Sequence, residues 1–301
     1  MSWLSVLSFV LFSLATLLIR PSYAGKLTLG DENVIVWFDS PLQNSAREVL
    51  KMYPALRVEL TTDLGWRTVF RPEVVLIKDS ASFRKAADSD LVTALAVPQK
   101  NLILIDSSKM HYQPFGLGTT LKHELCHLEL HHHIAENNLP RWFDEGICQW
   151  VSGGLSEIMT ESNHSILREA VLSNRLISFE ELTENFPTDG RDLLLAYDES
   201  RSIVEYIAKQ FGAPEVRKIL NRMSGGDNLE SAVSKTLLIS LDELQKRWKS
   251  SLSEEVSWFS YIGYNLYEIL FLLAALISIY GFFVVLKKRR EYRDKEDMEE
   301  E

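Results

Sequence analysis

Short apolar runs and longer amphipathic stretches alternate in the first third of the chain. Helical spacing of the apolar residues predicts a long helix over residues 40–64, broken or kinked at Pro54, and a short helix over 82–87. Continuous apolar runs predict buried strands at residues 34–38, 74–77, 93–97 and 102–105. Only four residues separate the last two runs, so we expect these strands to form a hairpin.

From Thr119 onward the apolar spacing is almost wholly helical. Gly, Pro and Asn residues separate segments that we predict to be helices at residues 119–135, 140–152, 164–174, 191–211, 213–223, 228–237 and 240–252. Strands followed by helices indicate an α+β fold. We expect a small mixed β-sheet subdomain, then a helical subdomain, with the candidate site between them, in one domain over residues 25–258.

A long apolar segment lies near each end of the chain. Residues 4–19 carry no charge and precede a small-residue cleavage pattern, which predicts a signal peptide over residues 1–24, either cleaved or retained as an anchor. A second run, residues 269–286, carries no charge and predicts a transmembrane helix over 262–286. The basic residues that follow indicate that the tail, 287–301, is cytoplasmic. The mixed charges of residues 291–301 predict that this part is disordered. The main domain would then be periplasmic or extracellular, and we expect the bacterial inner membrane as the location.

One pentapeptide, His123-Glu124-Leu125-Cys126-His127, carries the candidate chemistry. On a helix, His123 and His127 lie on the same face, separated by a rise of about 6 Å, so both imidazoles can reach one Zn²⁺ ion. Glu124 then lies beside the ion, where its carboxylate can take a proton from water. Thr119 or Thr120 is the predicted helix cap.

A catalytic zinc ion needs a third protein ligand, and two side chains compete for that position. Glu145 would be carried inward by a new helix that starts near Pro140, and Gly146 beside it permits close helix packing. His133 has the spacing used by metzincins, but Leu130 favours a continuing helix, which would rotate His133 away from the ligand face. We favour Glu145.

These segments resemble those of the gluzincin metallopeptidases. The pentapeptide followed by Trp142-Phe143-Asp144-Glu145-Gly146 is similar to the H-E-L-x-H … W-L-x-E-G-x-A pattern of peptidase MA-like domains. The resemblance covers roughly residues 27–252. It implies His123, His127 and Glu145 as the ligands of one zinc ion, and Glu124 as the general base.

The resemblance also implies a tyrosine that stabilises the oxyanion, and Tyr197 is our candidate. A core tyrosine whose hydroxyl is satisfied by a neighbour fits this position equally well. Thermolysin-like enzymes carry an Asp four residues after the ligand Glu, but Gln149 stands there, so no partner for a ligand His is predicted. The Gly-x-Met-Glu-Asn segment of gluzincin aminopeptidases is missing from the sequence, so recognition of an amino group is not implied.

The chain carries 32 basic and 42 acidic residues, for a formal charge of −10. Nucleic acid is therefore an unsuitable partner, because neutralising phosphates requires a basic face. We expect a membrane-anchored zinc metalloendopeptidase that acts on peptides or proteins. The alternative is a membrane-tethered binding module on the same scaffold without turnover.

The only cysteines are Cys126 and Cys148, one in each of the two candidate ligand segments. They are either small buried residues where two helices meet or a disulfide that ties those helices together, which an exported location would permit. We take packing as the simpler interpretation.

Overall fold

The computed structural model describes residues 25–87, 92–110, 116–153, 163–188, 190–264 and 266–299. The predicted signal peptide lies outside these residues. The chain divides into two compact units, Met1–Trp248 and Lys249–Glu301.

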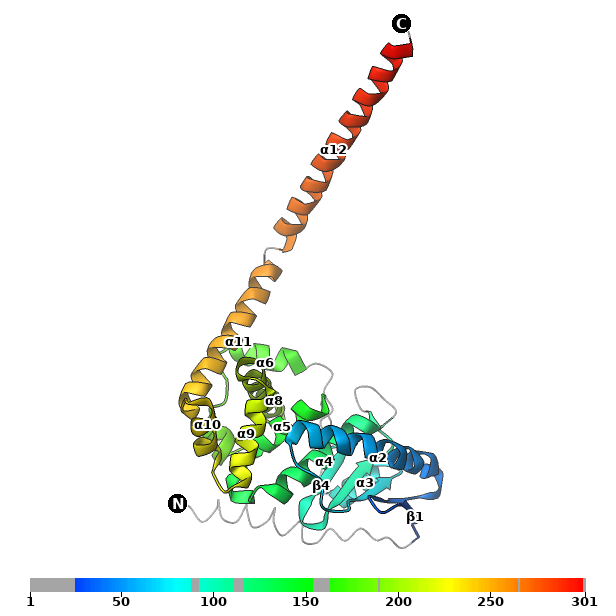
Figure 1. Cartoon of the computed structure of the whole chain (residues 1–301), viewed down its shortest axis with the longest axis vertical. Helices are drawn as coiled ribbons and strands as arrows, with labels where there is room; N and C mark the ends of the chain where they lie inside the picture. Colours follow the sequence, from blue (N-terminus) through cyan, green and yellow to red (C-terminus); the bar gives the residue numbers. More distant parts are fainter. Residues whose placement is uncertain are drawn as a thin grey trace. The chain divides into compact units, whose positions relative to one another are not determined.

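A five-stranded mixed sheet forms the amino-terminal part of the first unit (Figure 1). The strand order is β1-β2-β3-β5-β4; the three central strands are parallel, and the two edge strands run antiparallel to their neighbours. The strands are β1 (Leu27–Gly30), β2 (Ile35–Phe38), β3 (Glu73–Ile77), β4 (Ala94–Val97) and β5 (Leu102–Asp106). The predicted hairpin of β4 and β5 is confirmed, with the 3₁₀ turn η2 (Pro98–Lys100) between them. β1 was not predicted, because its four residues are mostly exposed and form no apolar run.

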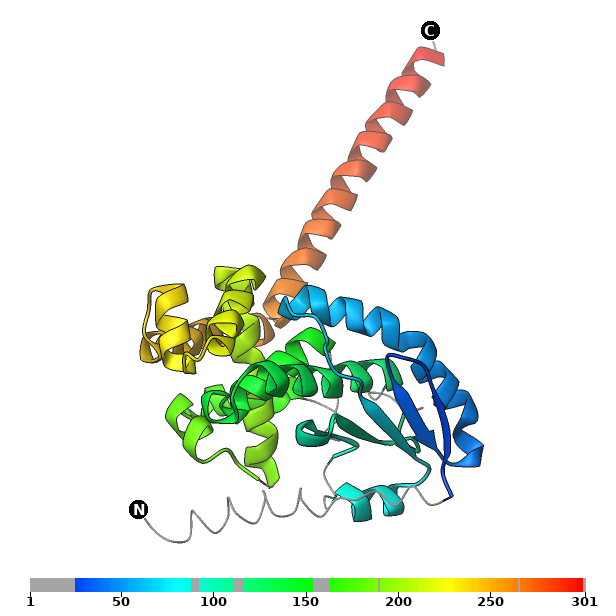
Figure 2. The same ribbon diagram turned by 60° about the horizontal axis from the view of Figure 1, so that its bottom comes forward.

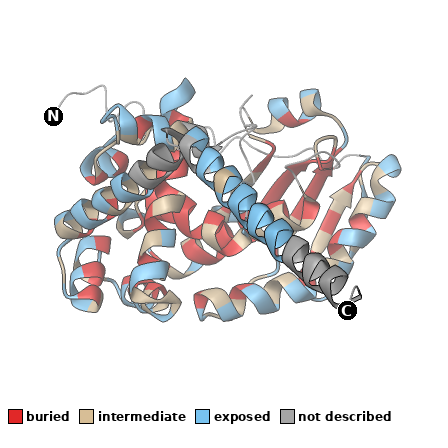
Figure 3. Cartoon of the chain, turned by 90° about the horizontal axis from the view of Figure 1, so that it is seen from above, coloured by how far each residue is buried: buried red, intermediate tan, exposed pale blue. Residues whose placement is uncertain are grey.

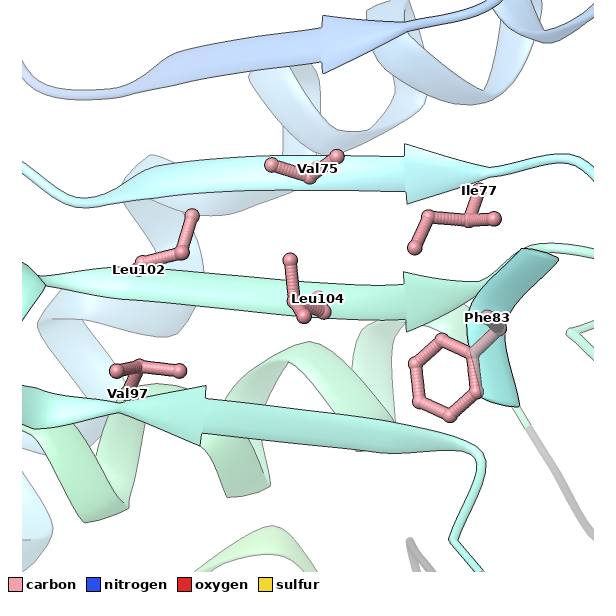
Figure 4. Packing of buried hydrophobic residues seen from close by; sticks show 6 residues of the cluster. All are labelled: Val75, Ile77, Phe83, Val97, Leu102 and Leu104. Atoms are coloured by element: carbon pink, nitrogen blue, oxygen red, sulfur yellow. The ribbon is translucent and has the colours of Figure 1, made fainter. Parts of the chain in front are cut away.

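Helices cover both faces of this sheet, which explains why its central strands are continuously apolar. On one face, Phe83 of α3 (Ser80–Ala87) packs on side chains of β3, β4 and β5 (Figure 4). Helices α2 (Gln43–Leu64) and α4 (Leu117–His133) lie on the other face (Figure 2). The short 3₁₀ turn η1 (Ser40–Leu42) precedes α2. α2 continues through Pro54 and bends along its length, so the predicted interruption is a bend and not a break (Figure 2).

The rest of the first unit is helical, and buried residues are concentrated in its middle (Figure 3). After α4 come η3 (Glu136–Asn138), α5 (Arg141–Ser152), α6 (Asn163–Leu172), α7 (Phe179–Glu184), α8 (Gly190–Phe211), α9 (Ala213–Ser224), α10 (Leu229–Leu237) and α11 (Leu241–Tyr264). The predicted helices are present, and α11 extends beyond its predicted end. The six-residue α7 was missed because it is too short to show a helical period. The α+β prediction is confirmed.

The start of α4 corrects one prediction. The N-cap is Gly116, and the backbone N–H of Thr120 donates to Gly116 O at 2.9 Å. Thr119 and Thr120 therefore lie inside the helix, and neither is its cap. The predicted cap was wrong because helical bonding begins about one turn earlier than the threonines suggest.

The second unit contains the carboxyl-terminal part of α11 and α12 (Leu266–Glu299). Within α12, Leu270–Lys287 is long and apolar enough to cross a membrane, and none of it is buried among the described residues (Figure 3). The helix continues to Glu299, although the tail was expected to be disordered. Lys, Arg and Glu are frequent there, and all three are good helix formers.

Candidate metal centre

The middle of α4 is buried, polar side chains included. His123 is 1% exposed, Glu124 0% and His127 7%. Ionisable groups at this depth normally bind a partner or a metal ion. A charged group that leaves water without such an interaction costs several kcal/mol. The helix therefore presents its two predicted ligands and the predicted base to the interior of the protein.

The structure brings the three predicted ligand side chains together. The Nε2 atoms of His123 and His127 face each other at 3.0 Å. From α5, Glu145 places Oε2 3.7 Å from Nε2 of His123 and 3.6 Å from Nε2 of His127. This oxygen is buried and has no hydrogen-bond partner among the described residues. A buried carboxylate oxygen that faces two imidazoles is the arrangement expected of a metal ligand.

The separations of the three atoms are close to those that a zinc ion requires. Tetrahedral coordination with bonds of about 2.0–2.2 Å separates ligand atoms by about 3.3–3.5 Å. The observed separations, 3.0, 3.6 and 3.7 Å, lie on both sides of that range. The circle through the three atoms has a radius of about 2.0 Å, the length of a zinc–ligand bond. Two imidazoles and a carboxylate are also donors that zinc accepts, so these residues fit the ion.

Glu145 reaches the histidines because α5 packs between α4 and α8. At Gly146, a Cβ atom would lie 2.8 Å from Val204 Cγ2 and 2.9 Å from Ser200 C, and closer still to Ser200 O. Such distances lie well inside normal contact, so only glycine permits this approach of α5 to α8. The prediction that Gly146 allows close packing is confirmed.

Asp144, which was not among the predicted site residues, orients His127. Its Oδ1 lies 2.8 Å from Nδ1 of His127, and its Oδ2 lies 3.0 Å from Nε2 of His131. Burial raises the pKa of Asp144, but the two imidazoles outweigh this effect and hold the pKa well below its usual range. An ionised carboxylate only accepts hydrogen bonds, so Nδ1 of His127 carries the hydrogen that it shares with Asp144. In a neutral imidazole this leaves Nε2 as the nitrogen that can bind a metal ion.

Gln149 occupies the position where a partner for a ligand histidine was sought, and it has another role. Its Nε2 donates to the backbone oxygen of Tyr197 at 3.2 Å, which links α5 to α8. The sequence signal for the true partner is an acidic residue directly before Glu145. That signal could not be interpreted without knowing how α4 and α5 cross.

Tyr197 of α8 lies beside the candidate ligand carboxylate. Its hydroxyl donates to Oε1 of Glu145 at 3.0 Å and accepts from Nη2 of Arg141 at 3.3 Å. The Arg141 guanidinium also lies over the ring of Phe186, 4.6 Å from its centre, and Tyr197 packs against the same ring. The structure thus brings Tyr197 to the site, while its role toward an oxyanion stays a prediction.

His133 lies elsewhere. The helix continues through Leu130, and the His133 ring stacks on Trp66 with 4.5 Å between the ring centres. Its Nδ1 lies 2.9 Å from the backbone oxygen of Glu129. The structure does not bring His133 to the group formed by His123, His127 and Glu145.

Cys126 and Cys148 form a disulfide that joins α4 to α5, with their Cα atoms 5.3 Å apart. Simple packing, which we took as the simpler interpretation, is therefore wrong. The sulfur of Cys148 also lies near His127 and Asp144, but it is bonded to Cys126 and offers no thiolate to a metal ion.

Comparison with known proteins places the chain in a family. A family model described as the peptidase MA superfamily matches residues 60–254. No match was found among curated proteins. Among solved structures, native yeast LTA4 hydrolase is similar, with 12% sequence identity and a TM-score of 0.46. The similarity covers 76% of this chain and 38% of the yeast protein. The match over residues 60–254 shows that the chain belongs to the peptidase MA superfamily.

Proposed function

We propose that this protein is a zinc-dependent endopeptidase whose ion is held by His123, His127 and Glu145. One observation carries the proposal: Oε2 of Glu145 is buried within 3.7 Å of both facing imidazole nitrogens. Membership of a peptidase superfamily supplies the reaction class, because a zinc site alone does not distinguish peptide hydrolysis from other chemistry.

His123, His127 and Glu145 would hold a zinc ion, which would supply polarisation of the substrate carbonyl and a lowered pKa of water, towards about 7. Glu124, fully buried beside His123 on α4, accepts a proton from the attacking water and passes it to the leaving amine. Asp144 keeps His127 in the tautomer that a ligand requires. Tyr197 orients Glu145 and, when substrate is present, donates its hydroxyl to the oxyanion.

The substrate is proposed to be an extended peptide bound along β4. This strand lies at the edge of the sheet and adjoins α4, so its outer backbone groups can pair with a peptide that passes the site. Pairing of this kind would hold the substrate peptide on either side of the cleaved bond. It therefore supports cleavage within a polypeptide, and the missing aminopeptidase segment agrees with it.

We further propose that the catalytic domain, residues 25–258, is periplasmic or extracellular and that α12 anchors it. The stretch Leu270–Lys287 would cross the bilayer, with the tail, 287–301, in the cytoplasm. Residues 1–24 would direct export, and the bacterial inner membrane is the proposed location. The disulfide supports an exported domain, because such bonds persist in oxidising compartments.

The test is the variant Glu124→Gln, assayed with an unstructured protein substrate. We expect it to keep one zinc ion per chain and to lose turnover by a factor of about 10²–10⁴, as expected for loss of a general base. Glu136→Gln makes the same change at an exposed position and should behave as the wild type. Normal turnover by Glu124→Gln would exclude Glu124 as the base. Wild-type protein that binds zinc but cleaves nothing would favour a tethered binding module.

A further inference from the structure

The Cys126–Cys148 disulfide lies between the two halves of the proposed zinc site. Cys126 directly precedes His127 on α4, and Cys148 follows Glu145 by three residues on α5. Both cysteines are 0% exposed. The bond therefore joins, within about one helical turn of the ligands, the helix that carries both imidazoles to the helix that carries the carboxylate.

The position of Glu145 relative to the histidines depends on how α5 lies against α4. Zinc–ligand bonds of about 2.0–2.2 Å tolerate little displacement, so a relative shift of about 1 Å between the helices would remove one ligand. The disulfide holds the two backbones at a Cα separation of 5.3 Å, close to the ligands. It opposes such a shift more directly than packing elsewhere in the domain.

A second contact would change when the disulfide is reduced. The sulfur of Cys148 lies 3.9 Å from Oδ1 of Asp144, the same oxygen that lies 2.8 Å from Nδ1 of His127. Reduction gives Cys148 a hydrogen, and the resulting thiol can donate to this oxygen. The thiol would then share with His127 the carboxylate oxygen that orients this ligand, and so weaken the bond to His127.

We propose that this disulfide is a positioning element of the zinc site and that its reduction by a dithiol weakens zinc binding. Two electrons and two protons pass from the dithiol, which becomes a disulfide, to Cys126 and Cys148, which become thiols. The peptidase would thus retain zinc firmly only in an oxidising compartment, after export. This inference rests on the proposed zinc site.

The experiment measures zinc affinity of the full chain in detergent, by competition with a chelator, at a temperature where every form is folded. The forms are the oxidised wild type, the wild type reduced with a phosphine that does not chelate zinc as dithiols do, and the double variant Cys126→Ser/Cys148→Ser. Mass spectrometry reports the bond, and circular dichroism reports folding. We expect the zinc dissociation constant to rise about 10- to 100-fold in the last two forms, as when an orienting partner of a ligand is lost.

Two controls separate positioning from general stability. Phe83→Leu weakens the core on the α3 face of the sheet and should leave zinc affinity unchanged. The phosphine should not change the double variant further. If the double variant does not fold, a time course replaces it. Phosphine is added to the zinc-loaded wild type, and zinc release and loss of the disulfide are followed together. Zinc release should then follow loss of the disulfide and precede any loss of helical signal.

The outcomes distinguish this inference from the function on which it rests. Zinc affinities that agree within about twofold in all three forms would overturn the positioning role and leave the zinc site standing. Zinc that is retained by folded, fully reduced protein, or released only on unfolding, would do the same. An oxidised wild type that binds no zinc would overturn both.

Discussion

The substitution Gly146→Ala tests the packing that carries Glu145 to the histidines. The added Cβ would lie 2.8 Å from Val204 Cγ2 and 2.9 Å from Ser200 C, whereas carbon atoms in contact are about 3.5–4.0 Å apart. Helices α5 and α8 must therefore separate by roughly 0.6–1.2 Å at this point. Overpacking of this size costs about 1–3 kcal/mol, against which alanine returns about 1 kcal/mol of helix propensity.

We therefore expect Gly146→Ala to lower the free energy of unfolding by up to about 2 kcal/mol, a fall in Tm of at most about 8 °C for a domain of this size. Zinc affinity should fall as well, because Glu145 moves with α5. Gly118→Ala is the matched control, since its Cβ would meet only the flexible Met52 side chain, at 3.6 Å. Thermal unfolding and chelator competition measure both effects. A Gly146→Ala protein as stable and as zinc-avid as Gly118→Ala would refute the close packing of α5 on α8.

Three further substitutions test the surroundings of the site. Asp144→Asn should raise the zinc dissociation constant about 10- to 100-fold, because His127 loses its ionised partner; unchanged affinity would show that Asp144 does not orient it. Tyr197→Phe should lower kcat about 10²- to 10³-fold with zinc still bound. If the variant instead loses zinc, and the zinc-loaded fraction keeps the wild-type kcat, the role of Tyr197 is limited to orienting Glu145. Burial raises the pKa of Asp198 to about 7, although Arg201 opposes the shift, so the folded protein holds a proton that the unfolded chain releases near pH 4. Stability should therefore fall as pH rises from about 4 to 7, and Asp198→Asn should stabilise by more at pH 8 than at pH 4 in denaturant titrations; an equal gain at both would contradict the raised pKa.

The pair of histidines could be predicted because both lie on one helix, where sequence spacing fixes relative position. To predict Glu145 as a ligand, a second helix had to be placed beside the first. That prediction depended on the glycine that follows Glu145, which allows close helix packing, and on the resemblance to a known pattern. Asp144 could not be predicted, since its contact with His127 depends on the crossing of α4 and α5. The disulfide was left open for the same reason: two cysteines in separate helices bond only if their Cα atoms come near enough.

Most of the fold followed from long periodic segments, and the errors concern short or ambiguous ones. β1 has four residues and α7 has six, so neither shows a period. Pro54 is no error: it predicted a break or a kink, and α2 continues through it with a bend, as the second alternative allows. The start of α4 was misplaced because Gly116 caps it without any side-chain hydrogen bond.

Metal analysis of the purified full chain tests the zinc site most directly, when the wild type is compared with Glu145→Gln and His133→Gln. We expect one zinc ion per chain in the wild type and in His133→Gln, with most of it lost from Glu145→Gln. A wild type without transition metal, or zinc that depends on His133 and not on Glu145, would contradict the proposed zinc site.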